Sequence, residues 1–148
     1  MPSEKLIQLF YNSHLVSLST ASEIANQFYP KSFIRNQFFL TEGQVSDEYF
    51  FLETGCMRSF ANNLEGNEVT TGFYQAGDVV FEVSSFFNRT RSKENIQVLT
   101  DCTGWCITYN DLNTLFHTLP EFREFGRAVL VKGFAGLKSR MLSMITAT

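Results

Sequence analysis

The sequence predicts a mainly β protein with flanking helices, in which eight strands form a jelly roll, also called a double-stranded β-helix. Three observations support this fold class. Short β-prone runs follow one another from Pro30 onward, glycines separate them where the chain must reverse, and helical patterns lie before and after this region. The chain has 148 residues, 44% of them hydrophobic, which suffices for one domain with a single core. Phenylalanine contributes 16 residues, so we expect a core of packed aromatic rings.

Residues 1–29 are predicted to form two short helices. In the first, apolar residues recur at roughly helical spacing until the pattern is interrupted near Asn12. In the second, Thr20 and Glu23 fit a capping box, in which the hydroxyl and the carboxylate accept hydrogen bonds from N–H groups at the start of a helix. We therefore expect the second helix to begin at Thr20 and to continue to about Phe28.

Residues 30–110 are predicted to form the β-roll, because turn residues divide them at the regular short spacing of sandwiches and barrels. The expected strands are Ser32–Arg35, Phe38–Thr41, Glu48–Glu53, Cys56–Ala61, Glu68–Tyr74, Asp78–Phe81, Asn95–Leu99 and Gly104–Tyr109. The glycines expected in the turns between them are Gly43, Gly55, Gly66 and Gly77.

Residues 111–148 are predicted to be helical. Asn110 is expected to cap one helix, and Pro120, preorganised for a first helical turn, to open another. The second helix begins with an apolar stripe suited to packing on the β-roll, made of Phe122, Phe125 and Val129.

Farther along this helix, five apolar residues are spaced 4, 3, 4 and 3 apart, as in the seam of a coiled coil. They are Leu130, Phe134, Leu137, Met141 and Met144, and we expect them to form a homodimer interface. The alternative is that the helix packs on its own domain. Glycines 126, 133 and 136 weaken the helix but allow neighbouring helices to approach closely.

Charge and hydropathy exclude several classes of protein. The net charge is −3 and no more than two basic residues are adjacent, so this chain carries no footprint for a nucleic-acid backbone. It has no apolar stretch of about 18 residues, and its first residues lack the order of a signal peptide. We therefore expect a cytoplasmic protein without membrane partners.

The cysteines and histidines argue against metal chemistry. Cys56, Cys102 and Cys106 form no Cys-x-x-Cys pair, so we expect buried free thiols, with a redox role for the last two left open. Jelly rolls also host cupin-like metalloenzymes, but these need several histidines on strands. This chain has only His14 and His117, both in predicted helices, so we expect no enzyme and no metal.

A series of landmarks in the β region resembles the cyclic nucleotide-binding sensor domain of the Crp/Fnr family of bacterial transcription regulators. The landmarks, in matching order and spacing, are Phe39–Gly43, Glu48–Arg58, Glu65–Glu68, Gly77–Asp78 and Glu82. The resemblance implies a β-roll that holds a small effector, and a long C-terminal helix that forms a homodimer. It also implies contact with DNA through a winged helix-turn-helix domain that this sequence lacks. The chain is then either a fragment of a longer regulator or a natural stand-alone sensor.

Residues 77–93 resemble the phosphate-binding cassette of that family. Glu82 takes the position of the glutamate that accepts a hydrogen bond from the ribose. Phe81 replaces the preceding glycine, so its side chain is expected where backbone and ribose approach closely. In a register without gaps, the phosphate-binding arginine is Ser92 and the next hydroxyl is Lys93. Arg89, Arg91 or Lys93 would substitute for that arginine only after a shift of the loop.

The adenine-contacting pair of the family falls on Leu137 and Lys138 in the same register, so its hydroxyls are absent. The candidate ligand-binding residues are Phe81, Glu82, Val83, Ser84, Ser85, Arg91, Ser92, Lys93, Leu137 and Lys138. Competing interpretations are that Glu82 pairs with a neighbouring Lys or Arg, and that the two serines only satisfy the start of a short helix.

The resemblance therefore favours a regulatory sensor for a cyclic nucleotide or another small anionic effector, without high affinity for cyclic AMP. The alternative is a degenerate sensor that binds nothing and serves as a dimerisation scaffold. An oxygen-sensing iron–sulfur role, known in the family, needs four thiolates, whereas this chain has three cysteines.

Overall fold

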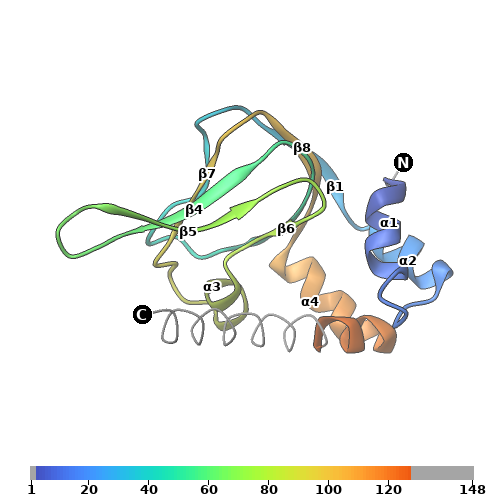
Figure 1. Ribbon diagram of the computed structural model, residues 1–148. Helices are drawn as coiled ribbons and strands as arrows, with labels where there is room; N and C mark the ends of the chain where they lie inside the picture. The colour runs from blue at the N-terminus through green and yellow to red at the C-terminus, as the bar shows by residue number, and fades with distance from the viewer. Residues whose placement is uncertain (1–2, 128–148) are drawn as a thin grey trace, which may run out of the picture.

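The computed structural model describes residues 3–127, which form a β-roll with helices packed against it (Figure 1). All eight predicted strands are present in this part of the chain. They are β1 (Tyr29–Phe33), β2 (Phe38–Leu40), β3 (Glu48–Thr54), β4 (Met57–Asn62), β5 (Glu68–Tyr74), β6 (Val79–Val80), β7 (Asn95–Val98) and β8 (Cys102–Thr108). The expected mainly β architecture is confirmed.

The strands form two antiparallel sheets of four, in the orders β1-β8-β3-β6 and β2-β7-β4-β5. β1 begins at Tyr29, three residues before the predicted start at Ser32, and includes Pro30. A proline fits here because β1 lies at the edge of its sheet, where a missing N–H costs no ladder hydrogen bond.

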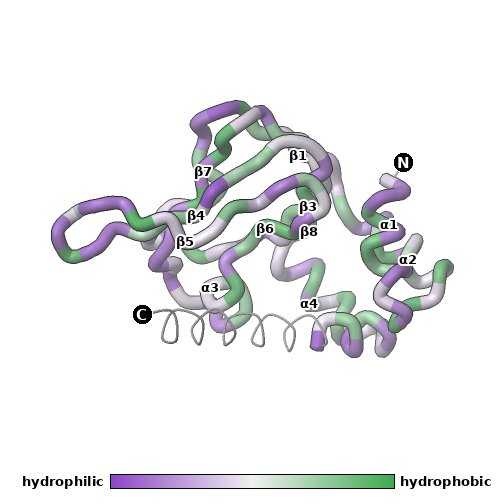
Figure 2. The backbone as a smooth tube through the Cα atoms, viewed as in Figure 1, coloured by the Kyte–Doolittle hydropathy of each residue, from purple (hydrophilic) through white to green (hydrophobic). Residues whose placement is uncertain are grey.

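The space between the sheets is filled by apolar side chains from both. The buried members are Leu40, Phe50, Leu52, Met57, Val80, Ile96, Val98, Cys102 and Cys106. The tube in Figure 2 shows hydrophobic residues along these strands and a mostly hydrophilic β4–β5 hairpin tip that extends away from the roll. The β-roll therefore has its own core.

Two helices precede the roll, α1 (Glu4–Tyr11) and α2 (Leu18–Ala25). The predicted capping box is wrong, because α2 starts earlier and its N-cap is Ser17, whose side chain accepts a hydrogen bond from the Thr20 N–H. The Glu121 carboxylate accepts from the Ser17 N–H and hydroxyl, so a residue distant in sequence supports this start. The predicted end at Phe28 is also wrong, since the helix ends at Ala25.

After the roll comes α4 (Tyr109–Thr118), and its cap also differs from the prediction. Thr108 is the N-cap rather than Asn110, because the Thr108 side chain accepts from the Asp111 N–H. Residues 120–127 are helical, and the predicted start at Pro120 is confirmed. A Cβ on Gly126 would lie 2.8 Å from Cζ of Phe116, so this glycine does allow the close approach that we expected.

A second core joins the helices to the outer surface of the roll. Phe10 of α1 contacts the rings of Phe28, Phe122 and Phe125 at centroid distances of 5.9, 5.8 and 5.1 Å. Phe122 and Phe125, which we expected to pack on the β-roll, are buried in this cluster, and their ring contacts are with the helix residues Phe10 and, for Phe122, Phe116. The predicted dimer seam, Leu130 to Met144, and the stripe residue Val129 lie outside the described residues.

The turn glycines behave as predicted, with positive φ at Gly43, Gly55, Gly66 and Gly77. Gly55 is required twice over, because a Cβ there would also meet the backbone carbonyl oxygen of Asp101. Among residues 3–127, no helix is long and apolar enough to cross a membrane.

Candidate functional site

The site is built around the short helix α3 (Val83–Asn88), which follows β6. Glu82 is its N-cap, and Oε2 accepts a hydrogen bond of 2.6 Å from the Ser85 N–H. A carboxylate is favourable at this place because the N–H groups of a first turn lack partners. The internal ion pair considered for Glu82 is not formed, since none of the ion pairs within residues 3–127 includes it.

Two serines fasten α3 to the loop before β3. Ser85 is only 1% exposed, and its Oγ accepts from the Ser46 N–H at 2.7 Å and donates to the Thr90 carbonyl at 2.6 Å. The Ser46 hydroxyl accepts from the Glu82 N–H at 3.2 Å. Both hydrogen-bonding roles of the Ser85 hydroxyl are thus taken within the chain, but they join two loops and do not satisfy the start of α3, which Glu82 caps. Ser84 and Val83 are exposed on the first turn.

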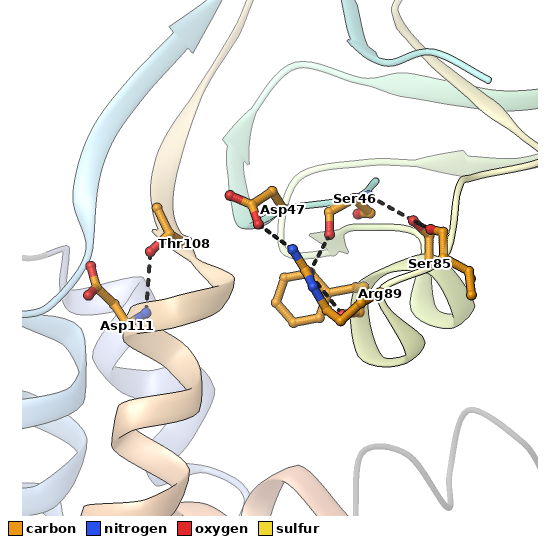
Figure 3. Close-up of polar contacts among 8 residues, drawn as sticks. Ser46, Asp47, Ser85, Arg89, Thr108 and Asp111 are labelled. Atoms are coloured by element: carbon orange, nitrogen blue, oxygen red, sulfur yellow. Dashed lines mark hydrogen bonds and ion pairs between the residues drawn. The ribbon is translucent and has the colours of Figure 1, made fainter. Parts of the chain in front are cut away.

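Arg89 ends α3 in the left-handed conformation, with φ of 57°. Its Nη2 donates to Asp47 Oδ1 at 2.6 Å, and its Nη1 donates to the carbonyls of Ser46 at 3.2 Å and Phe86 at 3.0 Å. The guanidinium carbon lies 3.8 Å from the ring centroid of Tyr109, the first residue of α4. Figure 3 shows the Arg89 side chain reaching from α3 to the loop before β3.

We call Arg89 and these partners the Arg89 clamp. It joins the cassette helix, the loop before β3 and the start of α4, and Asp47 also accepts the Tyr109 N–H through its carbonyl at 2.8 Å. The sequence indicates Arg89 only as a candidate replacement for the ligand-binding arginine, but its N–H donors bind groups within the protein. No local pattern marks Asp47 or Tyr109 as its partners.

The position expected for the phosphate-binding arginine is a closed turn. Ser92 is 2% exposed, and its Oγ donates to the Glu94 carbonyl at 2.9 Å and accepts from the Glu94 N–H at 3.0 Å. Its backbone exchanges hydrogen bonds with the loop before β3, donating to the Gln44 carbonyl and accepting from the Gly43 N–H. The flanking residues Arg91 and Lys93 are exposed. No side chain of cationic character stands at the arginine position itself.

Phe81 differs from its expected placement. Its ring packs against Tyr49, Phe86 and Phe87 at centroid distances of 5.0, 5.2 and 5.9 Å, and it is buried in the core shared with the helices. An aromatic residue is stabilised here by edge contacts with its neighbours. The side chain is thus packed against α3 inside this core and is not presented on the surface. Leu137 and Lys138 lie outside the described residues.

Acidic groups surround Tyr74, which projects from β5 near the cassette. Burial raises the pKa of Tyr74, and the negative charges of Glu94, Glu82 and Asp78 raise it further, while a hydrogen bond with Ser59 opposes them. Sequence reasoning missed Tyr74 and Ser59, because only the pairing of β4 with β5 brings them together.

A second polar cluster lies where β1, β3 and β8 meet. Glu48 accepts hydrogen bonds from Cys106 Sγ at 2.8 Å, Lys31 Nζ at 2.7 Å and the Tyr29 hydroxyl at 3.1 Å. Burial raises the pKa of Glu48, but the hydrogen bonds from Cys106 and Lys31 outweigh this effect and the net pKa is lowered. Burial and the Glu48 carboxylate raise the pKa of Cys106, so this thiol is held protonated.

Metal binding has no support in the part of the chain that the structure describes. Residues 3–127 contain no group of three or more His, Cys, Asp or Glu side chains placed to hold a metal ion. Nor does this part hold a buried side-chain nitrogen or oxygen without a hydrogen-bond partner.

Comparison with known proteins adds a family and a fold. Residues 30–118 match the family described as the cyclic nucleotide-binding domain. The structure is similar to the catabolite activator protein of Thermus thermophilus, with a TM-score of 0.75 and 18% identity over 91% of this chain and 62% of that one. Our sequence therefore spans less than two thirds of that protein.

Two further solved structures share the fold. The N-terminal domain of a transcriptional regulator from Streptomyces coelicolor A3(2) has a TM-score of 0.74 and 12% identity, covering 93% of this chain and 96% of that one. The regulatory domain of Toxoplasma gondii PKA, crystallised with cAMP, has a TM-score of 0.67 and 14% identity, covering 84% and 48%. A search of curated proteins finds no match.

Proposed function

The chain belongs to the cyclic nucleotide-binding domain family, and from this membership we propose that it is the ligand-sensing domain of a Crp/Fnr-type bacterial transcription regulator. The likeness to the bacterial activator supports this choice, as do the sequence landmarks from Phe39 to Glu82. The same fold serves kinase regulatory domains, so the choice between the two classes rests mainly on those landmarks. In this role a small effector binds near α3 and changes the balance between two states of the helices that follow.

We do not expect the domain to bind cyclic AMP with high affinity. The main support for this part of the proposal is the closed turn at Ser92. A cyclic phosphate is normally held by a bidentate, charge-assisted clamp from an arginine. Here that position is a buried serine bonded to Glu94, and the nearby Arg89 is already bound to Asp47. An effector that needs no arginine clamp fits these residues better.

Isothermal titration with cyclic AMP and cyclic GMP tests this proposal. We expect no heat of binding at micromolar nucleotide. The variant Glu82→Gln is measured beside it, with Glu65→Gln as a matched control, because Glu65 is exposed in the hairpin between β4 and β5. Micromolar binding that disappears in Glu82→Gln but persists in Glu65→Gln would contradict the proposal. Circular dichroism must show both variants folded, since Glu82 caps α3.

A positive search for the effector completes the test. Small anions and metabolites of several chemical classes are screened for an increase in the melting temperature, and each hit is examined by hydrogen exchange. A sensor predicts a hit that also alters exchange in α3 and α4, the helices joined by the Arg89 clamp. A tight ligand that leaves both helices unchanged would remove the signalling part of the proposal.

The second candidate function is a degenerate sensor that acts only as a dimerisation scaffold. One observation favours it: among residues 3–127 the buried polar side chains are all satisfied without a ligand. This candidate predicts that no compound shifts the melting temperature, while Phe134→Glu or Leu137→Glu converts a dimer into a monomer in analytical ultracentrifugation. A thermal shift with any nucleotide would count against it.

A further inference from the structure

Two cysteines that lie 46 residues apart in the sequence meet at one end of the β-roll. Cys56 follows Gly55 in the turn between β3 and β4, and Cys102 begins β8. The backbone of Cys56 is fixed to the turn before β8, since its carbonyl accepts from the Leu99 N–H at 2.9 Å and its N–H donates to the Thr100 hydroxyl at 3.0 Å. The two turns are therefore held against each other.

The two thiols share a neighbour, because both contact Thr100. Cys102 Sγ lies 3.5 Å from the Cys56 carbonyl oxygen and 3.1 Å from that of Thr100, and Cys56 Sγ lies 3.5 Å from the Thr100 hydroxyl. By standard backbone dimensions, Cys102 Sγ is then at most about 6 Å from the Cys56 Cα. A Cβ on Gly55 would come within 2.7 Å of Cys102 Sγ, so the missing side chain of this glycine lets the sulfur lie close to the turn.

We propose that Cys56 and Cys102 form a reversible intramolecular disulfide when the protein meets hydrogen peroxide. The distance between Cys102 Sγ and the Cys56 Cα is within the range that a rotation of the Cys56 side chain can close. Cys56 is half-buried and accessible to a small oxidant, whereas Cys102 is buried. Cys56 is therefore the attacking thiol and Cys102 the one that resolves the intermediate. This inference does not depend on the proposed function.

The chemistry balances with peroxide as the oxidant. The Cys56 thiolate attacks one peroxide oxygen, the O–O bond breaks, and a sulfenic acid and hydroxide form. The Cys102 sulfur then attacks the Cys56 sulfur, the S–O bond breaks, and the hydroxide leaves as water with the Cys102 proton. Overall the two thiols lose two electrons and two protons, and peroxide becomes two waters. A dithiol reductant reverses the reaction by thiol–disulfide exchange.

The assignment of roles has independent support. Burial raises the pKa of the Cys102 thiol, and the neighbouring Cys56 raises it further, which makes Cys102 a poor initial nucleophile. Cys106 is no competitor, because its thiol donates to Glu48 at 2.8 Å. Four residues along a strand also separate Cys106 from Cys102 by about 13 Å, so the redox pair left open by the sequence, Cys102 with Cys106, is not the one that the fold brings together.

The test is a peptide map of the wild-type protein treated with hydrogen peroxide, then unfolded, alkylated and digested without reduction. The expected product is a crosslinked pair of peptides containing Cys56 and Cys102, with Cys106 alkylated, and dithiothreitol restores all three thiols. The crosslink must persist in Cys106→Ser and vanish in Cys102→Ser. Oxidised wild type should also melt at a higher temperature than reduced wild type, because the crosslink joins the turn between β3 and β4 to the start of β8.

Several results would overturn the proposal. These are a crosslink between two chains, sulfinic acid at Cys56 without a crosslink, a crosslink to Cys106, or no loss of thiols under peroxide that oxidises a small dithiol completely. The map of the wild type decides the matter even if the Cys102→Ser variant fails to fold, because tandem mass spectrometry distinguishes Cys102 from Cys106 within one peptide.

Discussion

Replacing Arg89 has two opposing effects on the stability of the fold: it relieves backbone strain and it removes the contacts of the side chain. A residue other than glycine with φ of 57° is strained by about 1 kcal/mol or more, and glycine relieves this strain. The side chain, however, forms hydrogen bonds to Asp47 and to two carbonyls, and packs on Tyr109. We therefore predict the order of stability wild type, Arg89→Gly, Arg89→Ala, although alanine favours helices more than glycine does.

The magnitudes follow from the exposure of the groups. The Arg89 and Asp47 side chains are 35% and 55% exposed, so solvent limits this ion pair to at most about 1 kcal/mol. The two carbonyl bonds contribute about 1 kcal/mol each, and the contact with the Tyr109 ring about 0.5–1 kcal/mol. After the relief of strain, Arg89→Gly should lose about 2 kcal/mol of unfolding free energy, and Arg89→Ala about 3 kcal/mol.

Urea unfolding at fixed salt, followed by circular dichroism, measures this order, with Arg35→Ala at an exposed position as a control for loss of charge. A double-mutant cycle with Asp47→Asn isolates the ion pair, whose coupling should fall below about 1 kcal/mol and weaken further in high salt. Finding Arg89→Ala as stable as Arg89→Gly would refute the strain argument. Finding Arg89→Gly as stable as wild type would show that the clamp contributes no more than the strain that it offsets, about 1 kcal/mol.

Three more substitutions test other contacts. Gly126→Ala should lose about 1–3 kcal/mol of unfolding free energy, because its Cβ collides with the Phe116 ring; thermal melts check this, and an unchanged melting temperature would contradict it. Ser85→Ala should cost about 1–3 kcal/mol in urea unfolding, since it leaves the buried Ser46 N–H without a partner, and the exposed Ser84→Ala is the control. Glu48 has a lowered pKa, so its contribution is present above its ordinary pKa near 4.5 and is lost as the pH falls through the folded value. Glu48→Gln should therefore show a shallower loss of stability below about pH 4.5, and a curve parallel to wild type would argue against the ion-paired cluster.

The strands were predictable from sequence because their signals are local. Alternating apolar residues and turn glycines fixed all eight, and Glu82 was placed correctly at the start of a short helix. The caps of α2 and α4 were predicted less well. Their N-caps, Ser17 and Thr108, each stand shortly before another residue that is equally plausible as a cap. At Ser17 the choice is supported by Glu121, a contact of the folded chain that no local pattern reveals.

The interior of the site was beyond sequence reasoning for the same physical reason. The guanidinium of Arg89 finds Asp47 at a separation of 42 residues, and Ser85 finds Ser46 at 39. From the sequence alone, a cation in a loop is interpreted as a ligand contact or a solvated charge, because only the fold shows which residue is its partner. The direction of Phe81 likewise depends on a residue distant in sequence, because its ring packs against Tyr49 of β3 as well as on Phe86 and Phe87 of α3.

The turn at Ser92 bears on how such domains gain or lose their ligands in evolution. An arginine substituted at this position would have no room for its side chain, and the backbone around it is bonded to residues 43 and 44 of another loop. Placing an arginine here would thus need concerted changes in both loops, which behave as one unit because main-chain hydrogen bonds join them.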